Sequence, residues 1–356
     1  MSTIGRNPRS VGGCRSLLVR EVALGTGAVS DARMSDSIRW GILGTGTIAH
    51  AFAKGLRDAP GAELVAVGSR SQESADRFGD EFGIPRRHAT YAALAQDQDV
   101  DVIYVSTPHS RHCEDTVLCL KAGRHVLCEK PFALNLAEAE EMVACAKQHD
   151  RFLMEAMWTR FNPVMVKVRE LLAAGAIGEV RMLYADFGFR TDFDPSHRLF
   201  DPELGGGALL DVGVYPLALA HMVFGGAAPE ADGFASVGQT RVDEQCAWLM
   251  RYPNGALAVL SAATRTETPQ QATICGTKGM IRIPRFWDAR ELDLNGEAVP
   301  VEVVGNAYQY QALEVMERLR AGQRESGVMS LAMTLAIQRD LDALRSPWGV
   351  RYPSDD

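Results

Sequence analysis

The first half of the chain alternates between short apolar runs and amphipathic segments. Five apolar runs predict buried strands, at residues 39–43, 62–70, 100–108, 124–132 and 151–158. The intervening segments carry apolar residues at helical spacing, as at 72–83 and 135–150. Strands that are apolar on both faces and alternate with helices are typical of a parallel sheet covered on both sides. We therefore predict the α/β class, with a doubly wound, Rossmann-type parallel sheet at residues 37–160.

Beyond residue 160 the apolar runs are separated by turn residues instead of helices. Turn signals such as Pro253-Asn254-Gly255 and Asn295-Gly296 are typical of hairpins. Strands are predicted within residues 180–189, 246–264, 271–283 and 291–304, and helices at 163–175, 310–322 and 331–346. This pattern predicts an α+β domain with a large open, mostly antiparallel sheet at residues 161–356.

The first 36 residues differ from the rest of the chain. They are rich in Arg and Gly, and Arg20 and Glu21 interrupt their apolar run (17–19), which is too short for the core of a signal peptide. Met34 stands just before the first predicted strand. We interpret residues 1–36 as a disordered or over-called N-terminal extension. A leader sequence and an arm around a neighbouring subunit are the alternatives.

Charge and composition narrow the classes of partner. The formal net charge of -8 and the lack of a Lys/Arg block in the sequence disfavour a nucleic-acid partner. The sequence has no uncharged apolar stretch of about 18 residues, so no transmembrane helix is predicted. The seven cysteines are scattered without a C-x-x-C pair or a zinc-type His/Cys cluster, as is typical of reduced thiols. We expect a cytoplasmic protein with no metal, membrane or nucleic-acid partner.

A glycine-rich turn follows the first predicted strand. Gly44-Thr45-Gly46-Thr47-Ile48-Ala49 has the form G-x-G-x-x-A and leads into a predicted helix. The first Gly permits a tight turn, the second lets the backbone approach a pyrophosphate, and the small Ala lets the helix pack on the strand. The helix N-terminus offers free N–H groups to phosphates. The turn therefore predicts a dinucleotide site formed by residues 44–48.

The end of the second predicted strand indicates which dinucleotide is bound. An NAD site usually carries Asp or Glu there, to hold the ribose 2′-OH. This chain has Gly68-Ser69-Arg70 instead. Ser69 can donate to a 2′-phosphate, and Arg70 can pair with that phosphate or stack on adenine. We predict NADP as the cofactor in preference to NAD, with an ordinary exposed loop arginine as the alternative.

The ends of two further strands carry candidate cofactor contacts. Thr107-Pro108-His109 and His112 follow the third predicted strand, at the edge of the sheet where ligands bind. For both histidines a purely structural role in the loop is the alternative. Glu129-Lys130-Pro131 ends the fourth strand. A lysine at a buried strand tip is costly unless it is paired or used, so Lys130 is a candidate catalytic residue. The alternative is a side chain that reaches the surface.

Two polar side chains interrupt the apolar segment 208–220. Asp211 and Tyr215 are four residues apart and follow the glycines of residues 205–207. On a helix this spacing places both side chains on one face. A tyrosine with an ordinary pKa near 10 exchanges protons more readily when a lysine such as Lys130 stabilises its phenolate. Hydride transfer to or from an alcohol needs such a group beside the oxygen. The alternative is a core Asp–Tyr pair that satisfies itself.

Taken together, these motifs resemble one enzyme family. They are GILGTGTIA (41–49), STPHSRH (106–112), VLCEKPFALN (126–135) and GGGALLDVGVYPL (205–217). In this order they resemble the glucose–fructose oxidoreductase/inositol dehydrogenase/rhizopine-catabolism (Gfo/Idh/MocA) family over residues 37–352. With EAMWTRFNP (155–163), the chain is most similar to the branch of dimeric dihydrodiol dehydrogenases and NADP-dependent D-xylose dehydrogenases.

The resemblance implies roles for individual residues. Lys130 would be the catalytic lysine, Tyr215 the acid/base and Asp211 a carboxylate of the substrate site. Trp158 and Arg160 would lie near the cofactor and the active site. Trp287 resembles an aromatic wall of the substrate pocket, with ordinary packing as the alternative.

The resemblance also implies an activity and an assembly. The expected enzyme is an NADP(H)-dependent oxidoreductase that acts on a CH–OH carbon of an aldose, such as xylose or glucose, or of a trans-dihydrodiol. A homodimer or homotetramer formed through the C-terminal sheet is expected. One alternative is a non-catalytic NADP-binding redox sensor or regulatory protein. Another is a hydrolase or lyase that retains NAD, which Arg70 disfavours.

Overall fold

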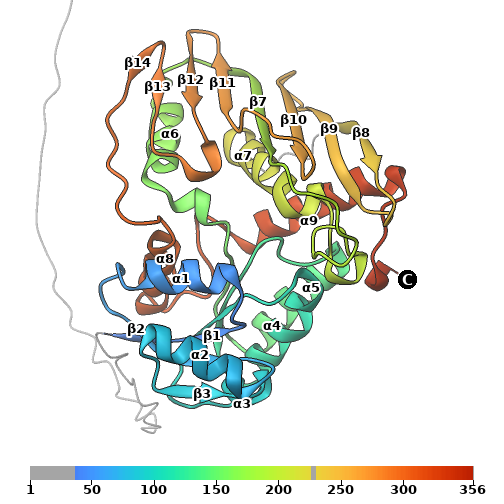
Figure 1. Ribbon diagram of the computed structural model, residues 1–356. Coiled ribbons are helices and arrows are strands. Elements are labelled where there is room, and N and C mark those ends of the chain that lie inside the picture. The colour runs from blue at the N-terminus through green and yellow to red at the C-terminus, as the bar shows by residue number, and fades with distance from the viewer. Residues whose placement is uncertain (1–36, 226–229, 356) are drawn as a thin grey trace, which may run out of the picture. The chain divides into compact units, whose positions relative to one another are not determined.

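The computed structural model describes residues 37–225 and 230–355, and the first part of this range forms a parallel sheet (Figure 1). Its strand order is β3-β2-β1-β4-β5-β6, and every pairing is parallel. The strands are β1 (Ile38–Leu43), β2 (Ala62–Gly68), β3 (Arg86–His88), β4 (Val102–Val105), β5 (His125–Cys128) and β6 (Leu153–Glu155). The doubly wound sheet is thus confirmed, with one additional edge strand, β3. The predicted N-terminal extension, residues 1–36, lies outside the described residues.

Five helices of the described chain accompany this sheet, and side chains cap three of them. They are α1 (Thr47–Leu56), α2 (Gln72–Phe82), α3 (Tyr91–Ala95), α4 (His112–Lys121) and α5 (Leu136–Gln148). Ser71 caps α2 by accepting from the Ser74 N–H, and Asn135 caps α5 in the same way through Glu138. Helix α1 starts at Gly46, which offers no side-chain cap. The first N–H groups of α1 therefore remain available to a ligand.

The second part of the chain forms an eight-stranded sheet in the order β14-β13-β12-β11-β7-β10-β9-β8. Its strands are β7 (Val180–Gly188), β8 (Glu230–Val237), β9 (Asp243–Arg251), β10 (Leu257–Ala263), β11 (Ala272–Gly276), β12 (Gly279–Ile283), β13 (Asp293–Leu294) and β14 (Glu297–Ala298). Only the β7–β10 pairing is parallel among these strands, so the sheet is mostly antiparallel as predicted. Strand β8 was not predicted. In place of the long strand expected at 291–304, the structure has only the short hairpin β13–β14.

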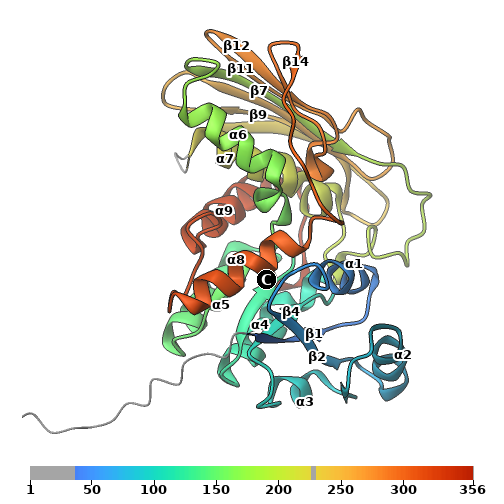
Figure 2. The same ribbon diagram turned by 90° about the vertical axis from the view of Figure 1, so that its left-hand side faces the viewer.

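Helices cover one face of this larger sheet. They are α6 (Pro163–Ala173) and α7 (Val214–Phe224), which lie against the sheet in Figure 2, and α9 (Leu331–Trp348), which packs against β8. Helix α8 (Gln309–Arg320) packs instead against α1 and residues 158–161. Short 3₁₀ turns complete the chain: η1 (His109–Arg111), η2 (Trp158–Phe161), η3 (Pro202–Leu204), η5 (Phe286–Asp288) and η6 (Pro353–Asp355). Helix α9 packs against α5, α7 and β8, so it ties the two sheets together.

The segment 202–224 is a long and strongly apolar part of the described chain. It is long and apolar enough to cross a membrane by composition alone, yet 83% of its most apolar window is buried inside the protein. Leu210, Val214 and Leu217 are fully buried, and α7 packs against β7 and β10. The apolarity of this segment therefore serves the core beneath the larger sheet.

The segment around Asp211 departs from the expected α-helix. Residues Leu209–Gly213 form a π-helical turn, η4, and the α-helical hydrogen bonding of α7 begins only at Val214. A π-turn inserts an extra residue into the helical repeat and re-aims the side chains around it. The simple spacing argument for Asp211 and Tyr215 is therefore replaced by this local geometry.

Two fixed contacts define where this helical segment begins. Gly207 has φ +119, in the region open to glycine. The next two residues lead to Leu209, whose N–H donates to the buried Asp243 Oδ2 at 2.6 Å. The Tyr352 hydroxyl donates to the Gly206 carbonyl at 2.7 Å. A Cβ on Gly207 would lie 2.5 Å from Asp243 Oδ1, so the turn has room only for glycine.

We predict that Gly207→Ala destabilises the protein more than Gly255→Ala. Gly255, in the β9–β10 turn, also has positive φ (+80), but no atom lies within 4 Å of an added Cβ. The control therefore loses only the conformational cost of a positive φ, about 1–2 kcal/mol. A loss of this size lowers Tm by a few degrees, at about 2–4 °C per kcal/mol. Gly207→Ala adds the clash with Asp243. Thermal unfolding followed by circular dichroism tests this, and equal shifts for the two variants would contradict it.

Candidate active site

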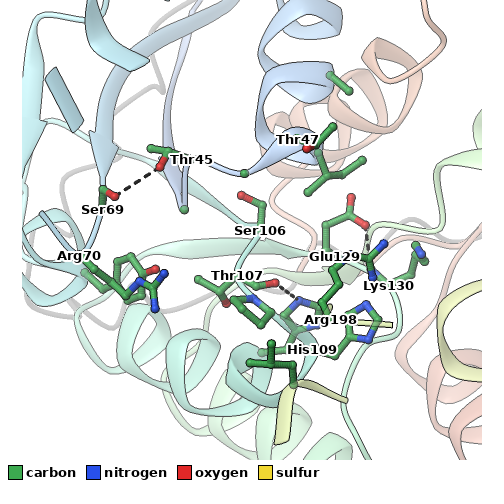
Figure 3. A pocket seen from close by; sticks show the side chains of 18 of the residues that line it. Thr45, Thr47, Ser69, Arg70, Ser106, Thr107, His109, Glu129, Lys130 and Arg198 are labelled. Carbon is green, nitrogen blue, oxygen red and sulfur yellow. Dashed lines mark hydrogen bonds between the residues drawn. The ribbon is translucent and has the colours of Figure 1, made fainter. Parts of the chain in front are cut away.

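A cavity of about 1060 Å³ opens at the carboxyl ends of the parallel strands. It runs from the start of α1 and the end of β2, past the tips of β4 and β5, where Figure 3 labels Thr107 and Lys130. It ends at the segment that carries Asp211 and Tyr215. Strand β1 lies between β2 and β4, so the strand order reverses here. Ligands of open α/β sheets bind at such a switch point.

The glycine-rich turn forms one end of this cavity. Gly44, Thr45, Gly46, Thr47 and Ile48 all line it. Gly44 has φ +101, and a Cβ there would lie 3.0 Å from the Ser106 carbonyl oxygen. At Gly46 an added Cβ would meet nothing within 4 Å, so the backbone is open toward the cavity. This end therefore offers bare backbone and the uncapped N-terminus of α1, which suits a pyrophosphate.

The end of β2 carries a polar cluster beside the glycine turn. Ser69 and Arg70 line the cavity, and the Ser69 hydroxyl lies 3.3 Å from the Thr45 hydroxyl. Ser71 and Ser74 at the start of α2 also line it, as does Tyr91. These last three were not predicted. Arg70 has no acidic partner among the described residues. Serine hydroxyls next to such an arginine resemble the partners that a phosphate group takes.

The two predicted histidines line the middle of the cavity and are buried. His109 Nδ1 donates to the Gly205 carbonyl at 2.9 Å. His112 Nδ1 and Nε2 lie 2.7 and 3.0 Å from the carbonyl oxygens of Pro131 and Thr107. Burial lowers the pKa of His109 to about 3 and that of His112 to about 4. Both rings are therefore neutral near pH 7, and each then has one N–H donor. His109 donates to Gly205, and His112 can donate to only one of the two carbonyl groups that face it.

Lys130 lies between Asp211 and Tyr215 at the end of the cavity opposite the glycine-rich turn, called the catalytic end below because it holds the candidate catalytic residues. Its Nζ donates to the main-chain carbonyl of Asp211 at 2.7 Å and lies 3.6 Å from the Asp211 carboxylate. The same Nζ lies 5.0 Å from the centre of the Tyr215 ring. Burial acts to lower the pKa of Lys130, but Tyr215, Asp211 and Glu129 outweigh it and the pKa is raised. The lysine is therefore charged.

Asp211 and Tyr215 both line the cavity, and their hydrogen bonds go to different partners. Arg198 Nη1 donates to Asp211 Oδ1 at 2.9 Å, and the Trp158 indole N–H donates to the Tyr215 hydroxyl at 3.2 Å. Burial alone would raise the pKa of Asp211, yet the charges of Lys130 and Arg198 hold it well below its usual range. Burial raises the pKa of Tyr215 against the opposing effect of Lys130. At neutral pH the site holds a carboxylate and a protonated phenol.

Glu129 lines the cavity beside Lys130 and is buried with a hydroxyl partner. Tyr104 donates to Glu129 Oε1, and the Lys130 main-chain N–H donates to Oε2 at 3.1 Å. Burial raises the pKa of Glu129 to about 7. The carboxyl group is thus divided between its neutral and charged forms near neutral pH.

Three of the predicted residues lie outside the cavity lining. Trp158 lies behind Tyr215, where it stacks on Tyr308 with ring centres 4.6 Å apart. Arg160 donates to the carbonyls of Val328 and Ala218 at 3.1 and 3.2 Å, and is buried.

Trp287 is separated from Tyr215 by one aromatic ring. It stacks on Phe187 with ring centres 4.7 Å apart, and Phe187 lies 5.4 Å from the Tyr215 ring.

Sequence reasoning missed residues at the catalytic end. Arg198 and Leu204 come from the long loop after β7, and Tyr308 comes from the turn before α8. The loop sequence is rich in Asp and Arg, as solvated loops often are, so nothing local singles out Arg198. Only its contact with Asp211, 13 positions further along, brings it into the site.

Two family models match the chain. Residues 38–157 match an oxidoreductase family with an NAD-binding Rossmann fold, and residues 165–282 match the GFO/IDH/MocA C-terminal domain. Trans-1,2-dihydrobenzene-1,2-diol dehydrogenase of Mus musculus is 39% identical over 332 residues, which cover 90% of this chain and 99% of the mouse protein. The Homo sapiens enzyme of the same name is 37% identical over 335 residues, with the same shares of the two chains covered.

Solved structures of oxidoreductases have a fold similar to that of this chain. An aldose-aldose oxidoreductase from Caulobacter crescentus, crystallised with glycerol, superposes with a TM-score of 0.79 at 27% identity, over 86% of this chain and 96% of that one. A 3-ketoreductase from Actinomadura kijaniata, in complex with NADP and TDP-benzene, gives a TM-score of 0.76 at 26% identity, over 89% and 98% of the two chains. With a dinucleotide-type cavity and motif matches in both halves, the chain belongs to the Gfo/Idh/MocA family of NAD(P)-binding oxidoreductases.

Proposed function

We propose that the protein is an NADP(H)-dependent dehydrogenase that acts on a CH–OH carbon of a sugar or a trans-dihydrodiol, with Lys130 and Tyr215 in proton transfer. The observation that carries the proposal is the position of Lys130. Its Nζ is fixed by the Asp211 carbonyl at 2.7 Å and lies 5.0 Å from the Tyr215 ring centre, in the same cavity as the open N-terminus of α1. An aldose such as xylose or glucose, or a trans-dihydrodiol, is the proposed substrate.

The residues present fit a dinucleotide along this cavity. Gly44 and Gly46 leave the backbone bare, and α1 begins without a side-chain cap, so its N–H groups would hold the pyrophosphate. Thr107, Pro108 and His109 would border the cofactor further along the cavity. When bound, the cofactor supplies a nicotinamide ring that exchanges a hydride with the reacting carbon.

The preference for NADP rests on the charge at the end of β2. Ser69, Arg70, Ser71 and Ser74 line this part of the cavity, and the acidic residues among the described lining, Glu129 and Asp211, are at the catalytic end. A 2′-phosphate would gain charge-assisted hydrogen bonds from this cluster. A ribose 2′-OH would find no carboxylate there among the described residues. The 3-ketoreductase with a similar fold was crystallised with NADP, in keeping with this preference.

Tyr215 moves the proton in the proposed reaction. When a carbonyl group is reduced, the Tyr215 hydroxyl donates its proton to the oxygen, and Lys130 stabilises the phenolate that remains. When an alcohol is oxidised, that phenolate accepts the hydroxyl proton as the hydride leaves the carbon. Because burial raises the pKa of Tyr215, Lys130 is needed to make the phenolate accessible. Asp211 fixes Lys130 through its carbonyl and carboxylate.

We also propose that two copies pair through the uncovered face of the larger sheet. Leu249 on β9 pairs with Val259 on β10, which pairs with Tyr184 on β7, so their side chains form one row. Leu249 and Tyr184 are 55% and 46% exposed, and Phe234 on the neighbouring β8 is 84% exposed. Adjacent exposed apolar side chains on a sheet are typical of an interface. A homodimer, or a tetramer built from such dimers, would cover them.

We predict that Tyr215→Phe loses about 100- to 10,000-fold in turnover while its affinity for NADPH stays unchanged. The variant removes only the hydroxyl, which bonds to Trp158. Tyr252→Phe is the control, because the hydroxyl of this buried tyrosine meets only Met250 Sδ, at 3.8 Å, among the described residues, and lies outside the cavity. Turnover is measured as NADPH absorbance with a panel of aldoses, polyols and a trans-dihydrodiol, and binding as NADPH fluorescence. Wild-type turnover in Tyr215→Phe would refute the role, and tight NADPH binding without turnover by the wild type would favour the sensor alternative.

We predict that Arg70→Gln lowers kcat/KM for NADP⁺ by about 10- to 100-fold and changes that for NAD⁺ little. This range corresponds to the loss of a charged hydrogen-bond donor to the 2′-phosphate. Arg181→Gln is the control, because Arg181 lies on β7 with its side chain 49% exposed and does not line the cavity. An equal loss of kcat/KM for both cofactors would show that Arg70 does not distinguish NADP⁺ from NAD⁺ by contact with the 2′-phosphate.

We predict that Leu249→Glu converts the assembly to monomers without loss of the fold. A charge placed in the row of Leu249, Val259 and Tyr184 cannot be desolvated against a second copy. Val304→Glu is the control, because Val304 is 54% exposed in the loop before α8. Light scattering after size exclusion reports the mass. An unchanged mass for Leu249→Glu, or a monomeric wild type, would contradict this interface.

A further inference from the structure

The polar contacts of the Asp211 carboxylate converge on one of its two oxygens. Oδ1 accepts from Arg198 Nη1 at 2.9 Å and lies 3.6 Å from Lys130 Nζ and 3.7 Å from His109 Nε2. None of the hydrogen bonds found among the described residues uses Oδ2. Asp211 lines the cavity, so Oδ2 is an acceptor available to a molecule bound there.

Arg198 offers donors at the same place. A guanidinium group has five N–H donors in a rigid plane, and the bond to Asp211 uses one of them. The side chain lines the cavity, where Figure 3 labels it. It is 52% exposed. Arg198 and Asp211 thus present a donor and an acceptor side by side, next to Lys130.

The loop that carries Arg198 is held by main-chain hydrogen bonds from the glycines of residues 205–207. The Gly207 N–H donates to the Leu199 carbonyl at 2.9 Å, and the Gly206 N–H donates to the Asp201 carbonyl at 2.9 Å. A Cβ on Gly206 would lie 2.7 Å from the Leu199 carbonyl oxygen. The backbone next to Arg198 is therefore held close to the start of the segment that carries Asp211, before any substrate arrives.

A donor beside an acceptor matches a hydroxyl group. A hydroxyl donates its proton to a carboxylate and accepts from a guanidinium at the same time. An ether or a carbonyl has no proton for Asp211, and a carboxylate would be repelled by it. Because Asp211 also contacts Lys130 at 3.6 Å, this hydroxyl would lie close to the group on which Lys130 and Tyr215 act.

We propose that Arg198 is a specificity-determining residue that, with Asp211, recognises a hydroxyl on the carbon next to the reacting CH–OH. The substrates are then vicinal diols, and the products are the corresponding α-hydroxy carbonyl compounds or lactones. This inference rests on the proposed dehydrogenase function, and it explains how one site accepts both aldoses and trans-dihydrodiols. Removing a substrate hydroxyl leaves Arg198 and Asp211 unpaired, and such a loss discriminates strongly between substrates.

The test compares each diol with its analogue that lacks the second hydroxyl. The pairs are glucose with 2-deoxyglucose and trans-cyclohexane-1,2-diol with cyclohexanol, each with NADP⁺. We expect the wild type to prefer the vicinal diols. Arg198→Gln should lose about 10- to 100-fold in kcat/KM on them and change little on the analogues, as expected for one charged hydrogen bond. Arg198→Lys, which keeps the charge without the planar fork, should fall between.

Arg190→Gln is the matched control. Arg190 precedes Arg198 in the same loop, its side chain is 74% exposed and pairs with Asp192, and it does not line the cavity. An equal loss on diols and analogues would overturn the proposal, because Arg198 would then act only on the charge of Asp211. A wild type that does not distinguish the members of a pair would overturn it too.

A binding measurement separates this inference from the proposed function. Calorimetry with the NADP⁺-loaded Tyr215→Phe protein and the same four compounds needs no turnover. If the diols bind tightly and Arg198→Gln weakens their binding about 10- to 100-fold, the result supports recognition by Arg198. This conclusion would hold even if the wild type turned over none of the four compounds. That lack of turnover would count only against the dehydrogenase function. Equal binding of a diol and its analogue would overturn recognition while leaving the dehydrogenase function standing.

Discussion

The catalytic end of the cavity depends on one buried negative charge. Asp211 is 3% exposed, and an isolated carboxylate in that position would take up a proton. Arg198 and Lys130 keep it ionised, and they come from the loop after β7 and from the tip of β5. Because both contacts meet at one carboxylate, they hold these three segments in one arrangement. The charge thereby fixes the end of the parallel sheet against the helical segment that leads into α7.

That helical segment is itself shaped by the turn that precedes it. Asp243 is fully buried, and burial raises its pKa to about 7, although hydrogen bonds from main-chain N–H groups and a thiol act to lower it. It holds the N–H of Leu209 while the Tyr352 hydroxyl holds the carbonyl of Gly206. The π-turn η4 then begins at once and turns both Asp211 and Tyr215 toward the cavity. A costly buried carboxyl group and an irregular helical turn are thus explained by the direction they give to two side chains.

The sequence was sufficient for the parts of this molecule that depend on local pattern. Apolar strands alternating with helices gave the parallel sheet, and the glycine turn lies where its spacing indicated. Lys130, Asp211 and Tyr215 could be singled out because each is a polar residue in an apolar run. Strand β3 was missed because its three residues, Arg86–His88, carry no apolar signal at the sheet edge. Strand β8 was missed because its residues are mostly exposed or half buried.

The remaining differences come from contacts between distant segments. Arg198 looks like any loop arginine until the fold brings it to Asp211, and Tyr308 reaches the cavity only because the turn before α8 packs on Trp158. The π-turn could not be read from residue spacing, because Asp243 and Tyr352, which fix its start, lie far along the chain. For Arg160, Trp158 and Trp287, the resemblance pointed to the neighbourhood of the site. The structure shows a layer behind it, in which Trp158 bonds to Tyr215 and Phe187 separates Trp287 from the same ring.

The distribution of charge along the cavity also bears on how a dinucleotide would lie in it. Arg70 and the uncapped N-terminus of α1 are at one end, and Glu129 and Asp211 are at the other. Phosphates would be attracted to the first end and repelled from the second. His109 and His112 between them are neutral, so they link main-chain segments without adding charge. The same separation would keep Lys130 paired with Asp211 instead of with a phosphate, as the proposed action of Lys130 on Tyr215 requires.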